Sequence, residues 1–210
     1  MEKNMLLKDV AYQKIKERIL EEHYEAGQFL SERTLIDELG MSKTPIKNAL
    51  VRLESEGFVT VSSKQGIIVN DISIEKINDI YSLRIALETF NCQEIYQRIT
   101  DEQLKELQEN IEATKKAAAD KDVRLFATLD HEFHLAISEF SGNNEITRVL
   151  LNYQDHLRRI TLRHLKKEPA RVQKFYSEHL EILQALKDRD ERCSELMKRH
   201  LLESKMMYFQ

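Results

Sequence analysis

"SERTLIDELGMSKTPIKNALVRLESEG", residues 31–57, decides the fold of the first third of the chain. Ser31 is a favoured helix N-cap and Gly40 a favoured C-terminal stop, so the residues between them predict a short helix. A second helix is predicted to begin at Ser42 or Thr44, with a proline in its first turn, and to end at the last glycine of the stretch. Two helices joined by a tight turn are typical of a helix-turn-helix.

The flanking sequence predicts a winged form of this motif. Residues 8–23 place apolar side chains at roughly helical spacing and predict a first helix. "FVTVSS" (58–63) and "GIIVND" (66–71) are rich in β-branched residues and predict two short strands joined around residues 64–66. Three helices followed by a β-hairpin wing form a winged helix-turn-helix, whose third helix enters the major groove of DNA.

The remaining two thirds of the chain are poor in turn-forming residues. Four of the five glycines lie within the first 70 residues. We therefore predict two domains, a winged helix-turn-helix at 1–72 and an all-helical domain at 73–210. Helices are predicted over residues 74–98, 101–119, 122–140, 144–166, 170–187 and 191–208. The expected fold class is mainly α, with the second domain a six-helix antiparallel bundle.

Bulk properties restrict the function classes. The chain has 210 residues and a net charge of −4, and residues 1–72 hold 10 basic and 12 acidic side chains, so any nucleic-acid site must be a local patch. The first residues show no signal peptide, and no apolar run is long enough to span a bilayer, so we expect no membrane partner. Cys92 and Cys193 lack metal-type or redox spacing, which favours a reducing cytoplasm.

The turn and third helix form the candidate DNA-reading segment. "MSKTPIKNALVR" (41–52) contains Lys43, Lys47 and Arg52 and no acid. Hydroxyl groups and a helix N-terminus can hold phosphate, while basic side chains reach bases or backbone. Charge alone leaves the alternative of a small helical subdomain with three surface cations about equally favoured.

The ordered set of motifs resembles the DNA-binding domain of the GntR superfamily of bacterial transcription regulators. It comprises the Ser-Glu-Arg start, the Ser-basic-Thr-Pro turn, the "AL-x-x-L-x-x-x-G" third helix and the wing glycine, over about 65 residues. The resemblance implies DNA contacts from Arg33, Ser42, Lys43, Thr44 and Lys47, with Gly66 at the wing tip. The family usually has arginine at the two lysine positions and glutamate in place of Asn48. Because lysine lacks arginine's bidentate fork, we expect a shifted or weaker operator preference.

A polar cluster interrupts the core-like segment "DVRLFATLDHEFHLAISEF", residues 122–140. On a helical wheel, Asp130 falls inside the apolar arc and His134, one turn later, lies at its edge. We expect both side chains to point inward. His131 and Glu132 fall outside the arc and are expected to be solvated.

Two further histidines, His179 and His200, lie on the apolar stripes of the last two predicted helices. One inward histidine is more often a satisfied core residue than a ligand, but three with an inward aspartate would each carry a desolvation cost if unpaired. A shared divalent metal would satisfy all four, and zinc is expected first, with nickel, manganese or iron as alternatives. His156 and His164 lie on an arginine-rich helix interpreted as partly a charged face, so we expect neither to be a ligand.

Residues 74–203 resemble the FadR C-terminal-type effector domain, abbreviated FCD, through "LRIALE", "DHEFH", "SGNNEI", "SEHLEILQALKDRD" and "MKRHL". Many members bind a metal through Asp-x-x-x-His and a histidine on each of the last two long helices. The resemblance thus implies a metal site at Asp130, His134, His179 and His200. The stretch before His200 is about one residue shorter than usual, so the helix start absorbs the difference or His200 moves and loosens the site.

Family members sense small carboxylates, often beside the metal. Arg84, Arg159 and Arg163 are therefore candidates to pair with an effector anion. The alternative is that each arginine forms a structural salt bridge, and for Arg84 the partner would be Glu88 one turn along the helix.

The leading interpretation is a ligand-responsive repressor, not an enzyme. A homodimer would bind a short inverted repeat of double-stranded DNA, and a metabolite bound at the metal would change the spacing or mobility of the DNA-binding heads. One alternative is a metal-dependent hydrolase or oxygenase centred on the three histidines and the aspartate. Another is a purely structural metal. The sequence does not identify the effector, the metal or the operator. It also does not show whether the effector releases DNA.

Overall fold

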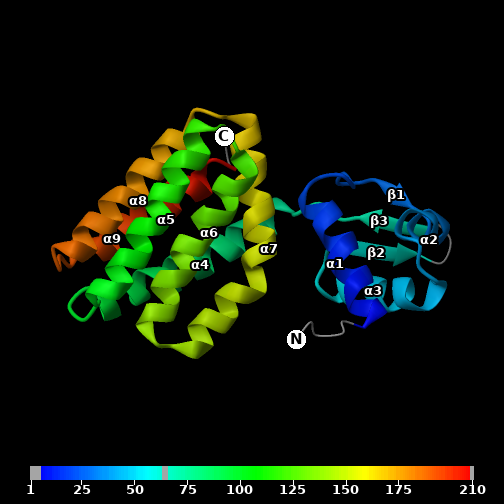
Figure 1. Ribbon diagram of the computed structural model, residues 1–210, viewed down its shortest axis with the longest axis horizontal. Helices are drawn as coiled ribbons and strands as arrows, with labels where there is room; N and C mark the ends of the chain where they lie inside the picture. Colours follow the sequence, from blue (N-terminus) through cyan, green and yellow to red (C-terminus); the bar gives the residue numbers. More distant parts are fainter. Residues whose placement is uncertain (1–5, 63–65, 209–210) are drawn as a thin grey trace. The chain divides into compact units, whose positions relative to one another are not determined.

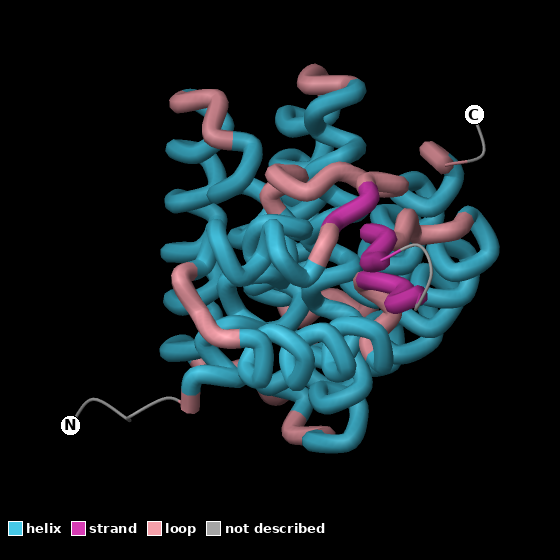
Figure 2. Tube along the Cα trace, turned by 90° about the vertical axis from the view of Figure 1, so that its right-hand side faces the viewer, coloured by secondary structure: helices cyan, strands magenta, loops and turns pink. Residues whose placement is uncertain are grey.

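The computed structural model describes residues 6–62 and 66–208 of the chain. The chain folds into two compact units, Met1–Ile72 and Ser73–Gln210. It is mainly helical, as predicted, and the strands gather in one small sheet (Figures 1 and 2). Residues 64 and 65 of the wing turn predicted around residues 64–66 lie outside the described residues.

The first unit has the winged helix-turn-helix arrangement that the sequence predicts. Its elements in order are α1 (Leu7–Leu20), β1 (Phe29–Leu30), α2 (Glu32–Leu39), α3 (Lys43–Ser55), β2 (Val59–Ser62) and β3 (Gly66–Val69). Helix α1 packs against α3, and the core between them buries Ile15, Ile19 and Leu53. This packing leaves the opposite side of α3 available to solvent.

The caps explain where the helix-turn-helix begins and turns. The Ser31 hydroxyl accepts a hydrogen bond from the backbone N–H of Thr34 at 3.0 Å, which confirms Ser31 as the N-cap of α2. Gly40 ends α2 in the left-handed conformation, with φ of 62°. Helix α3 then begins after Ser42, so Thr44 lies inside the helix.

The sheet has the order β1-β3-β2, with both pairs antiparallel. Strand β1 was not predicted, because two residues are too short to show the alternation that identifies a strand. Strand β1 constrains Gly66, whose φ is 86° and whose added Cβ would lie 2.9 Å from the backbone oxygen of Leu30. A glycine is therefore required at the start of β3 for structural reasons alone.

The second unit is a bundle of six helices among the described residues. They are α4 (Ile74–Ile95), α5 (Asp101–Ala119), α6 (Val123–Ser141), α7 (Asn144–Lys167), α8 (Arg171–Lys187) and α9 (Arg192–Met206). These bounds lie within three residues of the predicted ones. Helix α6 packs against α4, α5 and α7, while α8 packs against α5 and α9, and α4 packs against α9. No described helix is long and apolar enough to cross a membrane.

Helix α6 is held in register by both of its ends. At the start, Oδ1 of Asp122 accepts a hydrogen bond from the backbone N–H of Leu125 at 3.0 Å. At the end, Gly142 adopts the left-handed conformation with φ of 75°. Between these ends the helix buries Phe126, Phe133 and Ile137, and this packing fixes the direction in which its polar residues point.

Candidate metal centre and nucleic-acid interface

Four buried side chains from three helices converge inside the second unit. Helix α6 supplies Asp130 and His134, α8 supplies His179, and α9 supplies His200. One nitrogen or oxygen atom from each residue lies within 4.8 Å of the others, and each residue is at most 6% exposed. The structure thus brings together the four residues that the sequence picked out, and the shorter stretch before His200 has not displaced it.

The three imidazoles meet through the same ring atom. The Nε2 atoms of His134, His179 and His200 lie 3.2 Å from one another in all three pairs. Oδ1 of Asp130 lies 3.5 Å from Nε2 of His179. Ligands that share one small cation are separated by such distances, because metal–nitrogen bonds of about 2.0–2.1 Å place neighbouring donors about 3 Å apart.

Carboxylates set the tautomers of two of these histidines. Nδ1 of His134 lies 2.6 Å from Oε2 of Glu88, and Nδ1 of His200 lies 2.7 Å from Oε2 of Glu178. For His200 the contact is a hydrogen bond to an acceptor, so its Nδ1 carries the proton and its Nε2 presents a lone pair. The Glu88 carboxylate beside Nδ1 of His134 favours the same placement of the proton. Lone pairs that converge at 3.2 Å repel one another unless a cation or proton lies between them. Such carboxylate–histidine pairs are the usual support of metal-binding histidines.

The third imidazole, His179, is held by packing. Its ring is stacked on that of Phe133, with centroids 4.4 Å apart and planes 14° apart. Burial, followed by the neighbouring His200 and His134, holds the pKa of His179 well below its usual range, so the ring is neutral. A neutral imidazole is the form that binds a metal. Its Nδ1 atom has no hydrogen-bond partner among the described residues.

Arg84 takes part in the support of the centre through Glu88. Nε of Arg84 donates to Oε1 of Glu88 at 2.5 Å, and both side chains are buried. Burial by itself would raise the pKa of Glu88, but Arg84 and then His134 outweigh burial and hold this pKa below its usual range. The salt bridge considered as the alternative role of Arg84 is therefore present.

The other two candidate effector arginines lie on α7. Arg159 is 1% exposed, whereas Arg163 is half-buried. Helix α7 buries more of its polar residues than its interpretation as partly a charged face suggested, since His156 and His164 are also buried, whereas Lys166 and Lys167 are exposed. Composition alone did not show this burial, because α7 packs against α6 and also contacts α4 and α8. Neither histidine belongs to the convergent group among the described residues.

His131 is a second correction. It was expected to be solvated, but it is 7% exposed, whereas Glu132 is exposed as predicted. Burial, and then the nearby Arg84, lower the pKa of His131 to about 3, so this ring is also neutral. A helical wheel of α6 could not reveal this, because the buried arc is widened by the neighbouring helices α4 and α7.

The candidate nucleic-acid interface lies at the start of α3. The side chains of Lys43 and Lys47 are more than half exposed, and Arg33 on α2 is 91% exposed. Glu32 lies between the lysines: its carboxylate oxygens are 3.2 Å from Nζ of Lys43 and 3.9 Å from Nζ of Lys47. This contact was not predicted from the sequence, because Glu32 belongs to the preceding helix.

The other residues of the predicted interface have mixed roles. Ser42 and Thr44 are exposed at the N-terminus of α3, where backbone N–H groups can face phosphate. Arg52, counted among the basic residues of this segment, instead lies over the ring of Tyr12 at 3.6 Å and pairs with Glu56 at 3.0 Å. The positive patch therefore consists mainly of the residues nearest the turn.

Comparisons with known proteins agree with both units. A family described as "Bacterial regulatory proteins, gntR family" matches residues 7–69, and the "FCD domain" matches residues 79–203. The Nta operon transcriptional regulator of Aminobacter aminovorans is 27% identical over 85% of this chain and 83% of the relative. The gluconate operon transcriptional repressor of Bacillus licheniformis is 28% identical over 79% and 67%. The solved structure of E. coli McbR/YncC has the same fold, with a TM-score of 0.79 at 23% identity and 98% of both chains covered.

Proposed function

Because the chain belongs to the GntR family of bacterial regulatory proteins and carries an FCD domain, we propose that it is a repressor whose operator affinity is controlled by a small carboxylate bound at a divalent metal. The matched families and relatives are transcription regulators, so the hydrolase or oxygenase alternative has no support from them. As a regulator of transcription it would act in the cytoplasm. Operator recognition, metal binding and effector binding each rest on separate residues and have separate tests.

Operator DNA would be bound by the start of α3. The exposed lysines Lys43 and Lys47 face solvent beside Ser42 and Thr44, with Arg33 on the adjacent helix. Two such surfaces in a symmetric dimer would bind the two halves of a short inverted repeat.

Alanine substitution tests this assignment. Lys43→Ala and Lys47→Ala should each weaken binding to operator DNA in a titration followed by fluorescence anisotropy. Lys105→Ala removes an exposed charge from α5 and should leave affinity unchanged. Operator affinity equal to wild type in both α3 variants would contradict the assignment.

The metal would be held by Asp130, His134, His179 and His200. The single observation that supports this proposal most strongly is the mutual 3.2 Å separation of three buried Nε2 atoms, two of them on imidazoles whose other nitrogen faces a carboxylate. Histidine nitrogen and carboxylate oxygen suit zinc first, and nickel, manganese or iron also. Such an ion supplies Lewis-acid binding of an oxygen ligand, which is how a carboxylate would be recognised.

The interior also offers fixed positive charge to an effector anion. Arg84 and Arg159 are buried, and Arg163 is half-buried. Arg84 directs N–H groups to Glu88, but a guanidinium has five such donors and can bind a second carboxylate.

Gel shifts with a panel of small organic acids test the sensor proposal. We expect one of these acids to release operator DNA. The substitution Arg84→Met or chelation of the metal should abolish this release. If chelation lowered the melting temperature while the response to the acid stayed intact, the metal would be purely structural. If no acid changed operator affinity, the sensor proposal would fail.

A further inference from the structure

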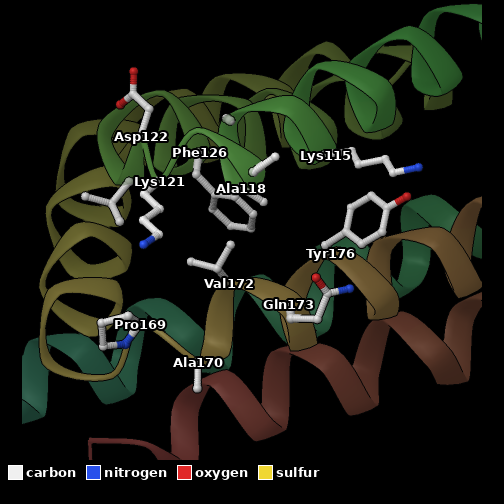
Figure 3. Close-up of a pocket in the computed structure, with 13 residues that line it drawn as sticks. Lys115, Ala118, Lys121, Asp122, Phe126, Pro169, Ala170, Val172, Gln173 and Tyr176 are labelled. Atoms are coloured by element: carbon white, nitrogen blue, oxygen red, sulfur yellow. The ribbon is translucent and has the colours of Figure 1, made fainter.

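A groove with a volume of about 760 Å³ lies in the second unit, where the end of α5 and the start of α6 face the start of α8 (Figure 3). Its walls are mainly apolar and include Ala118, Phe126, Val172 and Tyr176. Pockets of about 300–1,000 Å³ with apolar walls and a few polar groups are typical small-molecule sites. The histidines and aspartate of the candidate metal centre are not among the residues that line this groove.

The groove is lined by more positively charged than negatively charged side chains. Lys115 and Lys121 line it, and Figure 3 shows Lys121 reaching into the groove with Lys115 at its far edge. Asp122 is the one acidic residue among the described residues that line the groove, and Figure 3 shows it directed away from the groove. Its carboxylate accepts a hydrogen bond from the backbone N–H of Leu125 as the cap of α6. The groove therefore presents an apolar surface with positive charge at its margin.

We propose that this groove is a second ligand site, which binds a monoanion with an extended apolar body, such as an aliphatic or aromatic monocarboxylate. The apolar part would cover Phe126 and Val172, and the carboxylate would face Lys121. A neutral apolar molecule would lack the charge contact, and a small hydrophilic acid would gain little from the apolar walls. The ligand class thus differs from the small carboxylate proposed for the metal centre.

The groove and the metal centre share two helices. Phe126 lies about one turn before Asp130 on α6, and Tyr176 lies about one turn before His179 on α8. Phe126 also belongs to the same buried cluster as Phe175, whose ring meets that of His200 edge to face at 5.8 Å. A ligand in the groove would therefore stabilise the packing of α6 against α8 and raise the melting temperature.

The test uses 8-anilinonaphthalene-1-sulfonate, an aromatic monoanion that becomes fluorescent in apolar surroundings, with the purified full-length chain. We expect saturable binding of the probe, displaced by octanoate up to about fivefold more effectively than by 1-octanol, because one exposed ion pair contributes up to about 1 kcal/mol. Equal displacement by octanol would overturn the proposal, since the groove would then have no preference for an anion.

Three variants locate the probe. Lys121→Met and Gln173→Glu change the charge of two lining residues with little change in shape, and each should weaken octanoate binding about fivefold. Lys116→Met removes an exposed charge from α5 outside the groove and should have no effect. Affinities equal to wild type in both groove variants would place the probe elsewhere and overturn the proposal.

Two further measurements separate this proposal from its alternatives. Octanoate binding should persist after the metal is removed by chelation, so failure of the metal-centre proposal would leave this one standing. Sedimentation equilibrium should give the same oligomeric state for Gln173→Glu and wild type. A shift toward monomer in Gln173→Glu alone would mean that a second copy of the chain covers the groove, which would contradict the proposed ligand site.

Discussion

Nδ1 of His134 lies 2.6 Å from Oε2 of Glu88, and the same carboxylate is paired with the buried guanidinium of Arg84. The nearby carboxylate favours the proton of His134 on Nδ1, the nitrogen that faces away from the other histidines. Glu178 makes the equivalent contact with His200 at 2.7 Å. Two lone pairs are thereby directed at one point before any ion is present, so the site is organised in advance for a cation.

Glu178→Gln should lower metal affinity by about tenfold to hundredfold, the usual cost of losing a carboxylate that orients a ligand histidine. Glutamine keeps the shape but does not favour the charged or metal-bound state of His200 as a carboxylate does. Affinity is measured by competition with a chromophoric chelator. Glu181→Gln, an exposed change on the same helix, is the matched control. Equal metal affinity in Glu178→Gln and wild type would contradict this role for Glu178.

Glu88→Gln should lower the free energy of unfolding of the metal-free protein by about 3–5 kcal/mol, because it leaves the guanidinium of Arg84 buried without its carboxylate. Urea unfolding followed by circular dichroism measures the change. The double variant Arg84→Met with Glu88→Gln should recover part of the loss. A change below about 0.5 kcal/mol in Glu88→Gln, the range of an ordinary surface substitution, would show that the pair is not buried in solution.

His164→Phe should reduce the sensitivity of the fold to acid. Burial, followed by Arg171 and Lys167, lowers the pKa of His164 to about 4. Between its unfolded pKa of about 6.5 and this value, the unfolded chain binds a proton that the folded chain does not, so wild-type stability falls as the pH falls through this range. Phenylalanine keeps the ring contact with Tyr208 and has no proton to bind.

Thermal unfolding between pH 7 and pH 4.5 measures this difference. The fall in melting temperature should be smaller for His164→Phe than for wild type. Parallel curves for the two proteins would mean that His164 titrates equally in the folded and unfolded states.

Glu32→Gln should tighten DNA binding about twofold to fivefold and increase its dependence on salt. The Glu32 carboxylate contacts Lys43 and Lys47. Its removal would allow both ammonium groups to bind DNA phosphates without competition from this carboxylate. Fluorescence anisotropy over a series of salt concentrations measures both effects. Glu25→Gln makes the same charge change at an exposed position outside α2 and α3 and serves as the control. Weaker DNA binding in Glu32→Gln would show that Glu32 positions the lysines for DNA.

The sequence was sufficient to predict most of the architecture, because capping residues and periodicity are local signals. Helix α2 begins after Ser31 and ends before Gly40, as expected. The six helices of the second unit lie close to their predicted ranges. Strand β1 was missed, because its two residues gain their conformation from pairing with β3 and carry no periodic signal of their own. The family resemblance added the expected DNA contacts.

The candidate site could be predicted only in part. Asp130, His134, His179 and His200 were found because each interrupts an apolar stripe, a signal that a helical wheel can detect. The supporting residue Glu178 was missed, because its role depends on a contact with a different helix, 22 residues away in sequence. The burial of His131 was missed for the same physical reason: a helical wheel describes one helix and contains nothing about its neighbours.

Elemental analysis of the purified protein tests the central claim most directly. Inductively coupled plasma mass spectrometry of the wild type, purified without added metal or chelator, should find about one divalent transition-metal ion per chain, as expected for a single His₃Asp site. The variant His179→Ala, measured in parallel, should lose the ion while retaining a helical circular dichroism spectrum. The claim would be contradicted if the wild type were metal-free and could not be loaded with zinc, nickel, manganese or iron. It would also be contradicted if the metal content of His179→Ala were undiminished.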